Sequence, residues 1–239
     1  MSNALREVIE AARRIVFLGG AGVSTESGIP DFRSAAGLYN RAGGSRYAPE
    51  EILSRSFFDA HPEDFFAYYR THLVHTEALP NPAHVALANL ERTGRLSAVI
   101  TQNIDGLHQA AGSRRVLELH GSVHRNTCLG CGRRYGLDVV LAAEGVPRCA
   151  DCGQIIKPDV VLYEEALDPA VIQEAVAELA AADTLVVGGT SLQVYPAAGL
   201  VRVFAGRQLV LINRDATDYD GLATLTVREP IGQALGWLA

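Results

Sequence analysis

The cysteines of this 239-residue chain fall into two closely spaced pairs. Cys128 and Cys131 form one C-x2-C, Cys149 and Cys152 form the other, and seventeen residues separate the pairs. Each C-x2-C places two thiolates on one turn, and two such turns together supply the tetrahedral sulfur shell that zinc prefers. Because four protein ligands leave no open coordination position, we expect a structural zinc that does not activate water. A disulfide framework is the competing interpretation, but these spacings in an intracellular chain argue against it.

A glycine-rich turn follows the first apolar segment. Gly19, Gly20 and Gly22 follow the apolar run 15–18, so backbone N–H groups in this turn can approach an anion closely. The pyrophosphate of a dinucleotide is the obvious candidate. The whole stretch 19–33, GGAGVSTESGIPDFR, continues with hydroxyl and charged side chains, a polar density unusual for a connector. A tight turn without a ligand is the alternative.

Polar side chains also follow two later apolar segments. The pentapeptide TQNID at 101–105 ends the segment that begins at residue 96, and His120 follows the segment 116–119. Since the carboxyl ends of parallel strands face one ligand crevice, we expect the glycine loop, the pentapeptide and His120 to converge on one ligand. An imidazole there could exchange protons near neutral pH. The alternative is that His120 is a hydrogen-bonded core residue and that Asn103 or Asp105 merely caps the next helix.

The elements that must position these groups alternate along the chain. The periodicity predicts strands at 15–18, 96–101, 116–119, 184–187, 208–212 and 223–227. It predicts helices at 4–14, 62–73, 82–92, 107–111, 168–181 and 196–205, and one at the C terminus. Asn81 followed by Pro82 is typical of a helix start. The pattern predicts an α/β fold with an open, mainly parallel sheet, interrupted by a helical insert with a mobile loop and by a cysteine-bearing insert.

The composition limits the class of protein and its partners. The chain is 48% hydrophobic and 20% charged, as in ordinary globular proteins, and its net charge of −6 argues against nucleic-acid binding. Residues 1–14 are typical of an amphipathic helix and not of a signal peptide, and no apolar run approaches the roughly 20 residues of a membrane helix. We expect a cytoplasmic monomer with no nucleic-acid or membrane partner.

Seven separated motifs resemble those of the sirtuins of the bacterial type, which are NAD-dependent protein lysine deacylases. In chain order they are GAGVSTESGIPDFRS, TQNIDGLH, HGS, the paired cysteines, KPDVVLYEE, GTSLQVYPAAGL and Ile212-Asn213. The resemblance covers nearly the whole chain. It implies a Rossmann-like domain and a small domain, made of a zinc ribbon and a helical part, with NAD and acyl-lysine in the cleft between them. The Rossmann-like domain would comprise 1–31, 80–121 and 158–239, the helical part 32–79, and the zinc ribbon 122–157.

The resemblance also implies roles for the matched residues. His120 would be the general base and Asn103 a second catalytic residue. The positions that bind NAD would be Gly20, Ala21, Gly22, Thr25, Asp31, Phe32, Arg33, Gln102, Asn103, Ile104, Asp105, Gly189, Thr190, Ser191, Asn213, Asp215 and Ile231. The acyl-lysine substrate would contact Phe66, Tyr69, Val160, Val161, Leu162, Tyr163, Glu164, Gln193, Val194 and Tyr195. In the family's mechanism, the acyl group moves from lysine to ADP-ribose and nicotinamide is released, so NAD is consumed.

Three departures from common patterns bear on the substrate. The full G-x-G-x-x-G of dinucleotide oxidoreductases is absent, which fits NAD as a consumed substrate better than NAD as a hydride carrier. Sirtuins that prefer negatively charged acyl groups carry Tyr-x-x-Arg in the helix at the acyl pocket, where this chain aligns Phe66 and Tyr69, with Arg70 adjacent. We therefore expect acetyl or longer uncharged acyl groups. Finally, Tyr163-Glu164-Glu165 replaces the usual Phe-Gly-Glu.

Two other functions share the same NAD pocket. One is protein mono-ADP-ribosyl transfer. The other is a non-catalytic sensor of NAD or ADP-ribose, in which the zinc ribbon serves as a docking surface for proteins.

Overall fold

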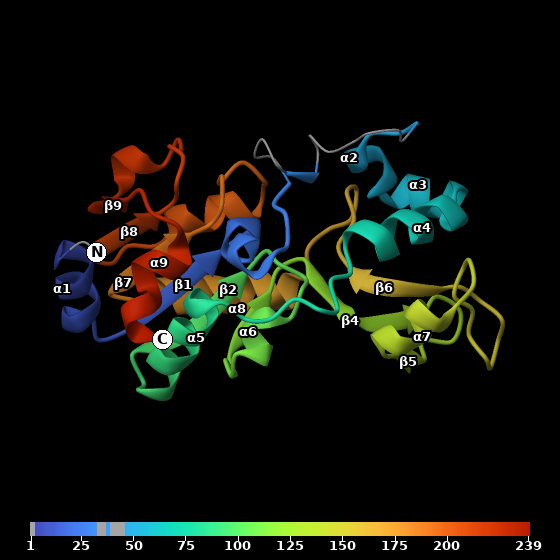
Figure 1. Cartoon of the computed structure of the whole chain (residues 1–239), viewed down its shortest axis with the longest axis horizontal. Helices are drawn as coiled ribbons and strands as arrows, with labels where there is room; N and C mark the ends of the chain where they lie inside the picture. The colour runs from blue at the N-terminus through green and yellow to red at the C-terminus, as the bar shows by residue number, and fades with distance from the viewer. Residues whose placement is uncertain (1–2, 33–36, 39–45) are drawn as a thin grey trace.

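Six parallel strands form the main sheet of the molecule (Figure 1). The computed structural model describes residues 3–32, 37–38 and 46–239. The sheet order is β3-β2-β1-β7-β8-β9. The strands are β1 (Ile15–Gly19), β2 (Leu96–Thr101), β3 (Val116–Glu118), β7 (Thr184–Gly188), β8 (Gln208–Ile212) and β9 (Leu225–Val227). All six predicted strands are confirmed to within two residues at each end, and so is the α/β fold class with a parallel, Rossmann-like sheet.

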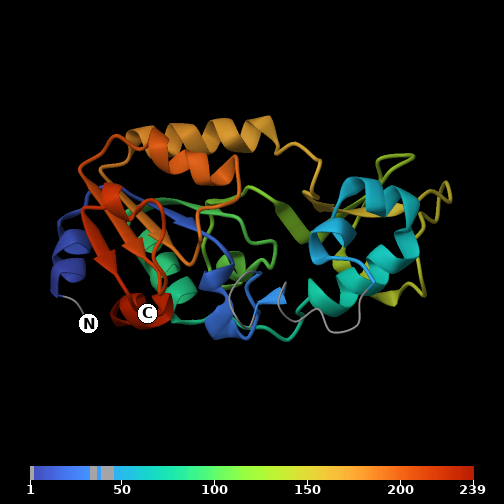
Figure 2. The ribbon, with the colours of Figure 1, turned by 90° about the horizontal axis from the view of Figure 1, so that it is seen from above.

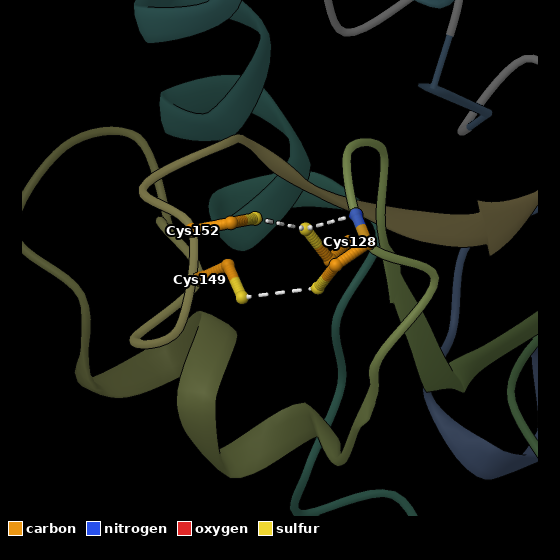
Figure 3. A group of neighbouring side chains, drawn as sticks. Cys128, Cys149 and Cys152 are labelled. Carbon is orange, nitrogen blue, oxygen red and sulfur yellow. Dashed lines mark hydrogen bonds between the residues drawn. The ribbon is translucent and has the colours of Figure 1, made fainter.

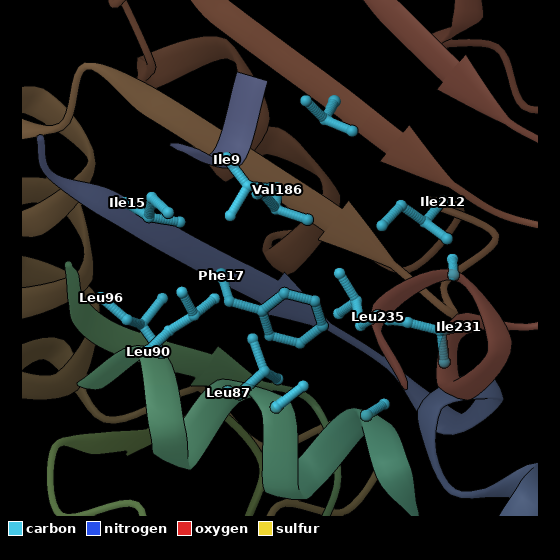
Figure 4. Packing of buried hydrophobic residues seen from close by; sticks show 14 of the residues in the cluster. Ile9, Ile15, Phe17, Leu87, Leu90, Leu96, Val186, Ile212, Ile231 and Leu235 are labelled. Carbon is cyan, nitrogen blue, oxygen red and sulfur yellow. The ribbon is translucent and has the colours of Figure 1, made fainter. Parts of the chain in front are cut away.

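Both faces of this sheet are covered, which explains why its central strands are continuously apolar. Strand β1 is buried at every position, with Ile15 and Phe17 facing one core and Val16 and Leu18 facing the other. The first face packs against α1 (Asn3–Ala11), α5 (Pro82–Arg92) and α9 (Ile231–Leu235), as Figure 4 shows. The second face packs against α8 (Pro169–Ala181) and the 3-10 helix Ala197–Val203.

Two predicted helices are shorter or tighter than expected. Helix α1 ends at Ala11 and not at residue 14, because the backbone N–H groups of Arg13 and Arg14 donate to Asp183 Oδ2 at 3.0 and 3.1 Å. The helix expected at 196–205 is a 3-10 helix, in a segment where Gly199 and two β-branched valines disfavour a regular α-helix. No helix in the described ranges has the length and apolar character of a bilayer-spanning segment.

A small module lies at one end of the parallel sheet (Figure 1, Figure 2). It contains an antiparallel sheet of β4 (Gly121–Cys128), β5 (Arg134–Tyr135) and β6 (Ile156–Val160), in the order β5-β4-β6. Its helices are α2 (Pro49–Ile52), α3 (Arg55–Ala60), α4 (Pro62–His72) and α7 (Leu137–Ala142). Phe58, Phe65 and Phe66 from the helices share one core with Val123 and Val160 from the sheet. The two inserts that the sequence separates therefore fold as one body.

The N terminus of α5 is capped as the sequence predicts, and the cap reaches the glycine-rich loop. Asn81 Oδ1 accepts a hydrogen bond from the Ala83 N–H at 2.9 Å, and Pro82 occupies the first turn. Asn81 Nδ2 donates to Val23 O at 2.7 Å and to Ser27 Oγ at 2.9 Å. The helix start thus fixes the far side of the loop that follows β1.

Two buried histidines make the fold sensitive to acid. His84 in α5 and His108 in α6 (Leu107–Ala110) contact each other with ring centroids 4.8 Å apart. Burial lowers the pKa of His84 to about 4 and that of His108 to about 3. Below pH 6.5 the unfolded chain therefore binds protons that the folded chain excludes, so stability is lost as the pH falls. We expect the free energy of unfolding to fall by about 1.4 kcal/mol per pH unit for each histidine between roughly pH 6 and pH 4.

Urea titrations at a series of pH values would measure this slope. The variant His84→Asn should reduce it, whereas His75→Asn, which changes a half-buried histidine outside this pair, should leave it as in the wild type. An equal slope in all three proteins would contradict the proposed role of the buried pair.

Candidate active site

A cleft of about 890 Å³ opens at the carboxyl ends of the parallel strands. Its walls are built from the segments that follow β1, β2, β7 and β8, together with residues 160–165 beyond β6 and a few residues of the small module. His120 and the pentapeptide residues 102–105 both line it. The structure therefore brings together the three features whose convergence the sequence predicts.

The glycine loop after β1 packs against the loop after β7. The N–H of Gly22 donates to Gly189 O at 2.8 Å, and the N–H of Gly20 donates to Gly188 O at 3.3 Å. A Cβ on Gly22 would lie 2.8 Å from Gly189 Cα, and one on Gly189 would lie 2.3 Å from Val23 N. These glycines permit the close approach of two protein loops because they lack a Cβ, and the N–H groups of Gly20 and Gly22 are already used within the fold. The expectation that these N–H groups contact an anion is thus corrected for Gly20 and Gly22.

A buried hydrogen-bond network joins the glycine loop to the pentapeptide. Ser24 Oγ donates to Asp105 Oδ2 at 2.7 Å and accepts from Asn103 Nδ2 at 3.0 Å. Ser24 is 1% exposed and Asn103 is 9% exposed. Asp105 Oδ1 also accepts from the Leu107 N–H at 2.9 Å, so the capping interpretation of Asp105 holds alongside its place in the cleft. The site assignment from the sequence omitted Ser24, although its hydroxyl within the glycine-rich stretch 19–33 was a usable signal.

His120 lies at the cleft wall in a defined tautomer. Its Nδ1 is 2.9 Å from the backbone oxygen of Gln102, and a carbonyl oxygen only accepts, so Nδ1 carries the proton. The neutral ring then presents Nε2 as a proton acceptor. Burial lowers the pKa of His120, and the hydrogen bond to Gln102 partly opposes this. The imidazole is therefore neutral at neutral pH and suited to general-base chemistry.

The loops after β7 and β8 are linked by one side-chain amide. Asn213 Nδ2 donates to Thr190 O at 2.9 Å, while its Oδ1 accepts from the Thr190 N–H at 3.1 Å. Thr190 Oγ1 in turn accepts from Gln102 Nε2 at 3.1 Å. Arg228 braces the next residues by donating to Asp215 O at 2.7 Å. These bonds hold the far end of the cleft in one shape.

Most residues predicted to bind NAD line this cleft. They are Ala21, Gly22, Thr25, Asp31, Phe32, Gln102, Asn103, Ile104, Asp105, Gly189, Thr190, Ser191, Asn213, Asp215 and Ile231. Gly20 is not among the residues that line the cleft, although it belongs to the same loop. Arg33 falls outside the described residues, as does most of the mobile loop expected at 34–47.

The residues predicted to contact the acyl-lysine substrate divide into two groups. Those that line the cleft are Val160, Val161, Leu162, Tyr163, Glu164, Gln193, Val194 and Tyr195. Phe66 and Tyr69 do not line it, because helical spacing turns both into the aromatic core of the small module, where each is fully buried. Arg70 points away as well, since its Nε donates to Val140 O at 2.9 Å.

The four cysteines meet at a single point in the small module (Figure 3). Their sulfurs all lie within 4.8 Å of one another, with Cys128 to Cys152 at 3.4 Å and Cys131 to Cys149 at 3.6 Å. Tetrahedral zinc with about 2.3 Å bonds to sulfur requires S···S separations of about 3.8 Å, so the cluster fits this ion. All four are free thiols, which removes the disulfide alternative.

Hydrogen bonds stabilise the thiolate form of two of the four cysteines, Cys128 and Cys149. The N–H groups of Gly130 and Cys131 point to Cys128 Sγ at 3.4 and 3.5 Å. The Tyr135 hydroxyl lies 3.0 Å from Cys149 Sγ, and this hydrogen bond lowers the pKa of Cys149 to about 6. None of the four cysteines is among the described residues of the cleft wall. The site is therefore structural and separate from the chemistry of the cleft.

Comparisons with known proteins agree with this geometry. The chain is 54% identical to an NAD-dependent protein deacetylase of Clostridium acetobutylicum over 98% of this chain and 96% of that protein. It is 57% identical to one of Cutibacterium acnes over 95% of this chain and 93% of that protein.

Solved structures of Sir2 proteins are also similar to this chain. A Sir2 homolog in complex with NAD superposes with a TM-score of 0.90 at 38% identity, covering 100% of this chain and 92% of that one. Sir2Tm bound to a propionylated peptide gives 0.86 at 38% identity, covering 97% and 94%. The model of the Sir2 family matches residues 20–196, which include His120, the cysteine cluster and most of the cleft wall. This chain belongs to the Sir2 family.

Proposed function

We propose that the chain is an NAD-dependent protein lysine deacetylase, which moves the acyl group from lysine to ADP-ribose and releases nicotinamide. The observation that carries this proposal is His120, a neutral base with a free Nε2, in the same cleft as the Ser24, Asn103 and Asp105 network. Its curated relatives are NAD-dependent protein deacetylases, and solved relatives hold NAD, ADP-ribose or a propionylated peptide.

Each wall of the cleft has a separate task in this proposal. NAD supplies the ribose carbon that receives the acyl oxygen, and nicotinamide is its leaving group. Asn213, Asp215 and Ile231 hold the adenosine half, and residues 102–105 hold the nicotinamide ribose. His120 Nε2 accepts a proton from a ribose hydroxyl, while the Gln102 carbonyl holds the ring in the required tautomer. Zinc, held by the four cysteines, supplies only structure.

Two segments of the cleft wall would bind the peptide. Segments 160–164 and 191–195 line the cleft, and in this proposal they would flank an extended peptide on either side. Main-chain hydrogen bonds supply affinity without reading side chains, so we propose a broad range of acyl-lysine protein substrates.

The pH profile of the reaction should have an acid limb below the ordinary histidine range. Burial lowers the pKa of His120, so the ring stays neutral, and active as a base, to a lower pH than a free imidazole would. We expect kcat/KM to be constant from about pH 8 down to about pH 6.5 and to fall only below that value. Steady-state kinetics in constant-ionic-strength buffers would show this limb. A rate that already declines between pH 8 and pH 7 in the acid direction would contradict it.

The enzyme should discriminate against negatively charged acyl groups. Arg70 is committed to the backbone of the small module, so it is not available to pair with a succinyl carboxylate in the cleft. We expect a succinyl-lysine peptide to react at least about tenfold more slowly than the acetyl-lysine peptide, since an unpaired carboxylate is costly to desolvate. Mass spectrometry of both peptides would give the ratio. Arg70→Ala should leave the ratio unchanged, and a change would show that Arg70 reaches the acyl group.

One assay separates the proposal from its alternatives. The protein is incubated with NAD and an acetyl-lysine peptide, and deacetylated peptide, nicotinamide and O-acetyl-ADP-ribose are followed by mass spectrometry. Stoichiometric formation of all three supports deacetylation. A mass increase on a protein target would instead support mono-ADP-ribosyl transfer, and tight NAD binding without turnover would support a sensor.

The remaining assignments are proposals of the same kind. We propose a Rossmann-like domain of 1–31, 80–121 and 158–239, although β6 carries the small sheet across residue 158 by pairing Pro158 with Asn126. We also propose a monomer without nucleic-acid partners, consistent with the net charge of −6. A cytoplasmic location is consistent with four free thiols, which persist in reducing compartments.

A further inference from the structure

Two residues of the described chain hold a backbone conformation that normally favours glycine. Glu164 has φ +75° and Leu192 has φ +55°, and within the described ranges no other residue except glycine has a positive φ. They stand in two segments that line the cleft, 160–164 and 191–195. Such conformations cost free energy and persist only where the surroundings enforce them, often at binding sites.

The two residues are held by different means. Leu192 is buried in the core, and its N–H donates to Thr190 Oγ1 at 3.2 Å. Glu164 is exposed, so packing does not hold it. Instead, its carboxylate receives two hydrogen bonds from the first turn of α3: the Ser56 N–H donates to Oε2 at 2.8 Å and the Ser56 hydroxyl donates to Oε1 at 2.9 Å.

This contact reinforces a longer attachment of the cleft edge to the small module. The Tyr163 N–H donates to Leu53 O at 2.9 Å, and the Arg55 N–H donates to Tyr163 O at 3.0 Å, so Tyr163 pairs with Ser54 as a short parallel bridge. Glu165 holds the end of this segment in place through ion pairs with Arg55 and Lys157, both at 3.1 Å. Tyr163 lines the cleft between these attachments and is 39% exposed.

We propose that Glu164 is a positioning residue for the acyl-lysine peptide. By binding Ser56 with both carboxylate oxygens, it holds Tyr163 and the peptide-facing edge 160–164 against α3 in the shape that receives the substrate. This inference rests on the proposed deacetylase function, and it assigns to Glu164 an effect on peptide binding and not on the chemistry at His120.

The variants Glu164→Gly and Ser56→Ala test the contact from both sides. Glycine accepts φ +75° without strain, so Glu164→Gly should fold, yet it loses both hydrogen bonds. We expect the dissociation constant and the KM for an acetyl-lysine peptide to rise about tenfold, with kcat and the KM for NAD within about twofold of the wild type. Ser56→Ala removes one of the two bonds and should raise the peptide KM about threefold. In the double variant, Ser56→Ala should add nothing further, because the partner is gone.

Glu164→Gln and Glu174→Gln control for charge. Both remove one carboxylate charge, but Glu174 lies on α8, 55% exposed and paired with Arg115 far from Ser56. Glu174→Gln should leave peptide and NAD parameters unchanged. If Glu164→Gln raised the peptide KM while Ser56→Ala left it unchanged, Glu164 would act by attracting the peptide directly, and the positioning role would be overturned.

Peptide binding is measured apart from turnover, so that a failure of this inference can be told from a failure of the proposed deacetylase function. Fluorescence anisotropy with a labelled acetyl-lysine peptide gives the dissociation constants in the absence of NAD. A wild-type protein that binds the peptide without turning it over would reject the deacetylase, while the ratio between variants would still decide the role of Glu164. Unchanged peptide affinity in Glu164→Gly, or a wild type that does not bind the peptide, would overturn the inference.

Discussion

Replacing His120 with alanine should lower the rate of deacetylation by about 10²- to 10⁴-fold, the usual contribution of a positioned general base. The neutral ring presents Nε2 to the cleft, because Nδ1 is bonded to the Gln102 oxygen. Removing the ring takes away the proton acceptor without disturbing the glycine loop or the Ser24, Asn103 and Asp105 network. The loss should therefore appear in kcat, while the dissociation constant for NAD stays within a few-fold of the wild type.

Two measurements separate a chemical role of His120 from a structural one. The melting temperature of His120→Ala should lie close to that of the wild type, because the residue is only half-buried and its ring is held by one hydrogen bond, to the Gln102 backbone oxygen. His61→Ala removes an exposed ring that packs on Phe57, away from the described cleft wall, and should keep full turnover. Full turnover by His120→Ala would exclude this residue as the base.

Loss of the zinc should destabilise the small module and, through it, the cleft. Strand β4 ends at Cys128, and β6 runs from the second cysteine pair to the cleft residues 160–165. Since β4 and β6 pair in one sheet, a metal held by the four cysteines would fix the sheet that positions these cleft residues. Structural zinc contributes on the order of 10 kcal/mol to folding in small domains. We expect Cys128→Ser to lose several kcal/mol of stability, which corresponds to a fall of more than about 10 °C in melting temperature, together with most of the activity.

Metal analysis and chelation would test this prediction. The purified wild type should contain one zinc per chain, and a strong chelator should lower the melting temperature and the activity in parallel. Added zinc should restore both, whereas added magnesium, which prefers oxygen ligands, should not. A zinc-free protein with unchanged melting temperature would show that the four thiols are not a structural metal site.

The local sequence pattern was sufficient to predict most of the helices and strands. The strands and the start of α5 depend on runs of apolar residues and on the Asn81-Pro82 cap, which are properties of neighbouring residues. The prediction was wrong at the end of α1, where Asp183, distant in sequence, takes the N–H groups that would have continued the helix. It was wrong in type at 196–205, where the helix is 3-10.

The site was predicted in part by chemistry and in part by resemblance. Residue types and spacing were enough for the cysteine cluster, since four thiols at these intervals have few other uses. The convergence of His120 with 102–105 followed from the rule for parallel strands. Phe66 and Tyr69 were placed by alignment alone, and the direction in which α4 turns them depends on packing against the small sheet.

The sequence alone thus determined the α/β class and the four-thiol cluster, because both depend on residue type and short spacing, and the family resemblance proposed His120 as the proton acceptor. Only the tertiary structure decided which of these groups share a cleft, which tautomer His120 adopts, and that the glycines after β1 serve the contact with Gly189. It also decided that Glu164 is held in a left-handed conformation by Ser56, more than a hundred residues away in the chain. Such contacts depend on how distant segments pack, and no local pattern encodes them.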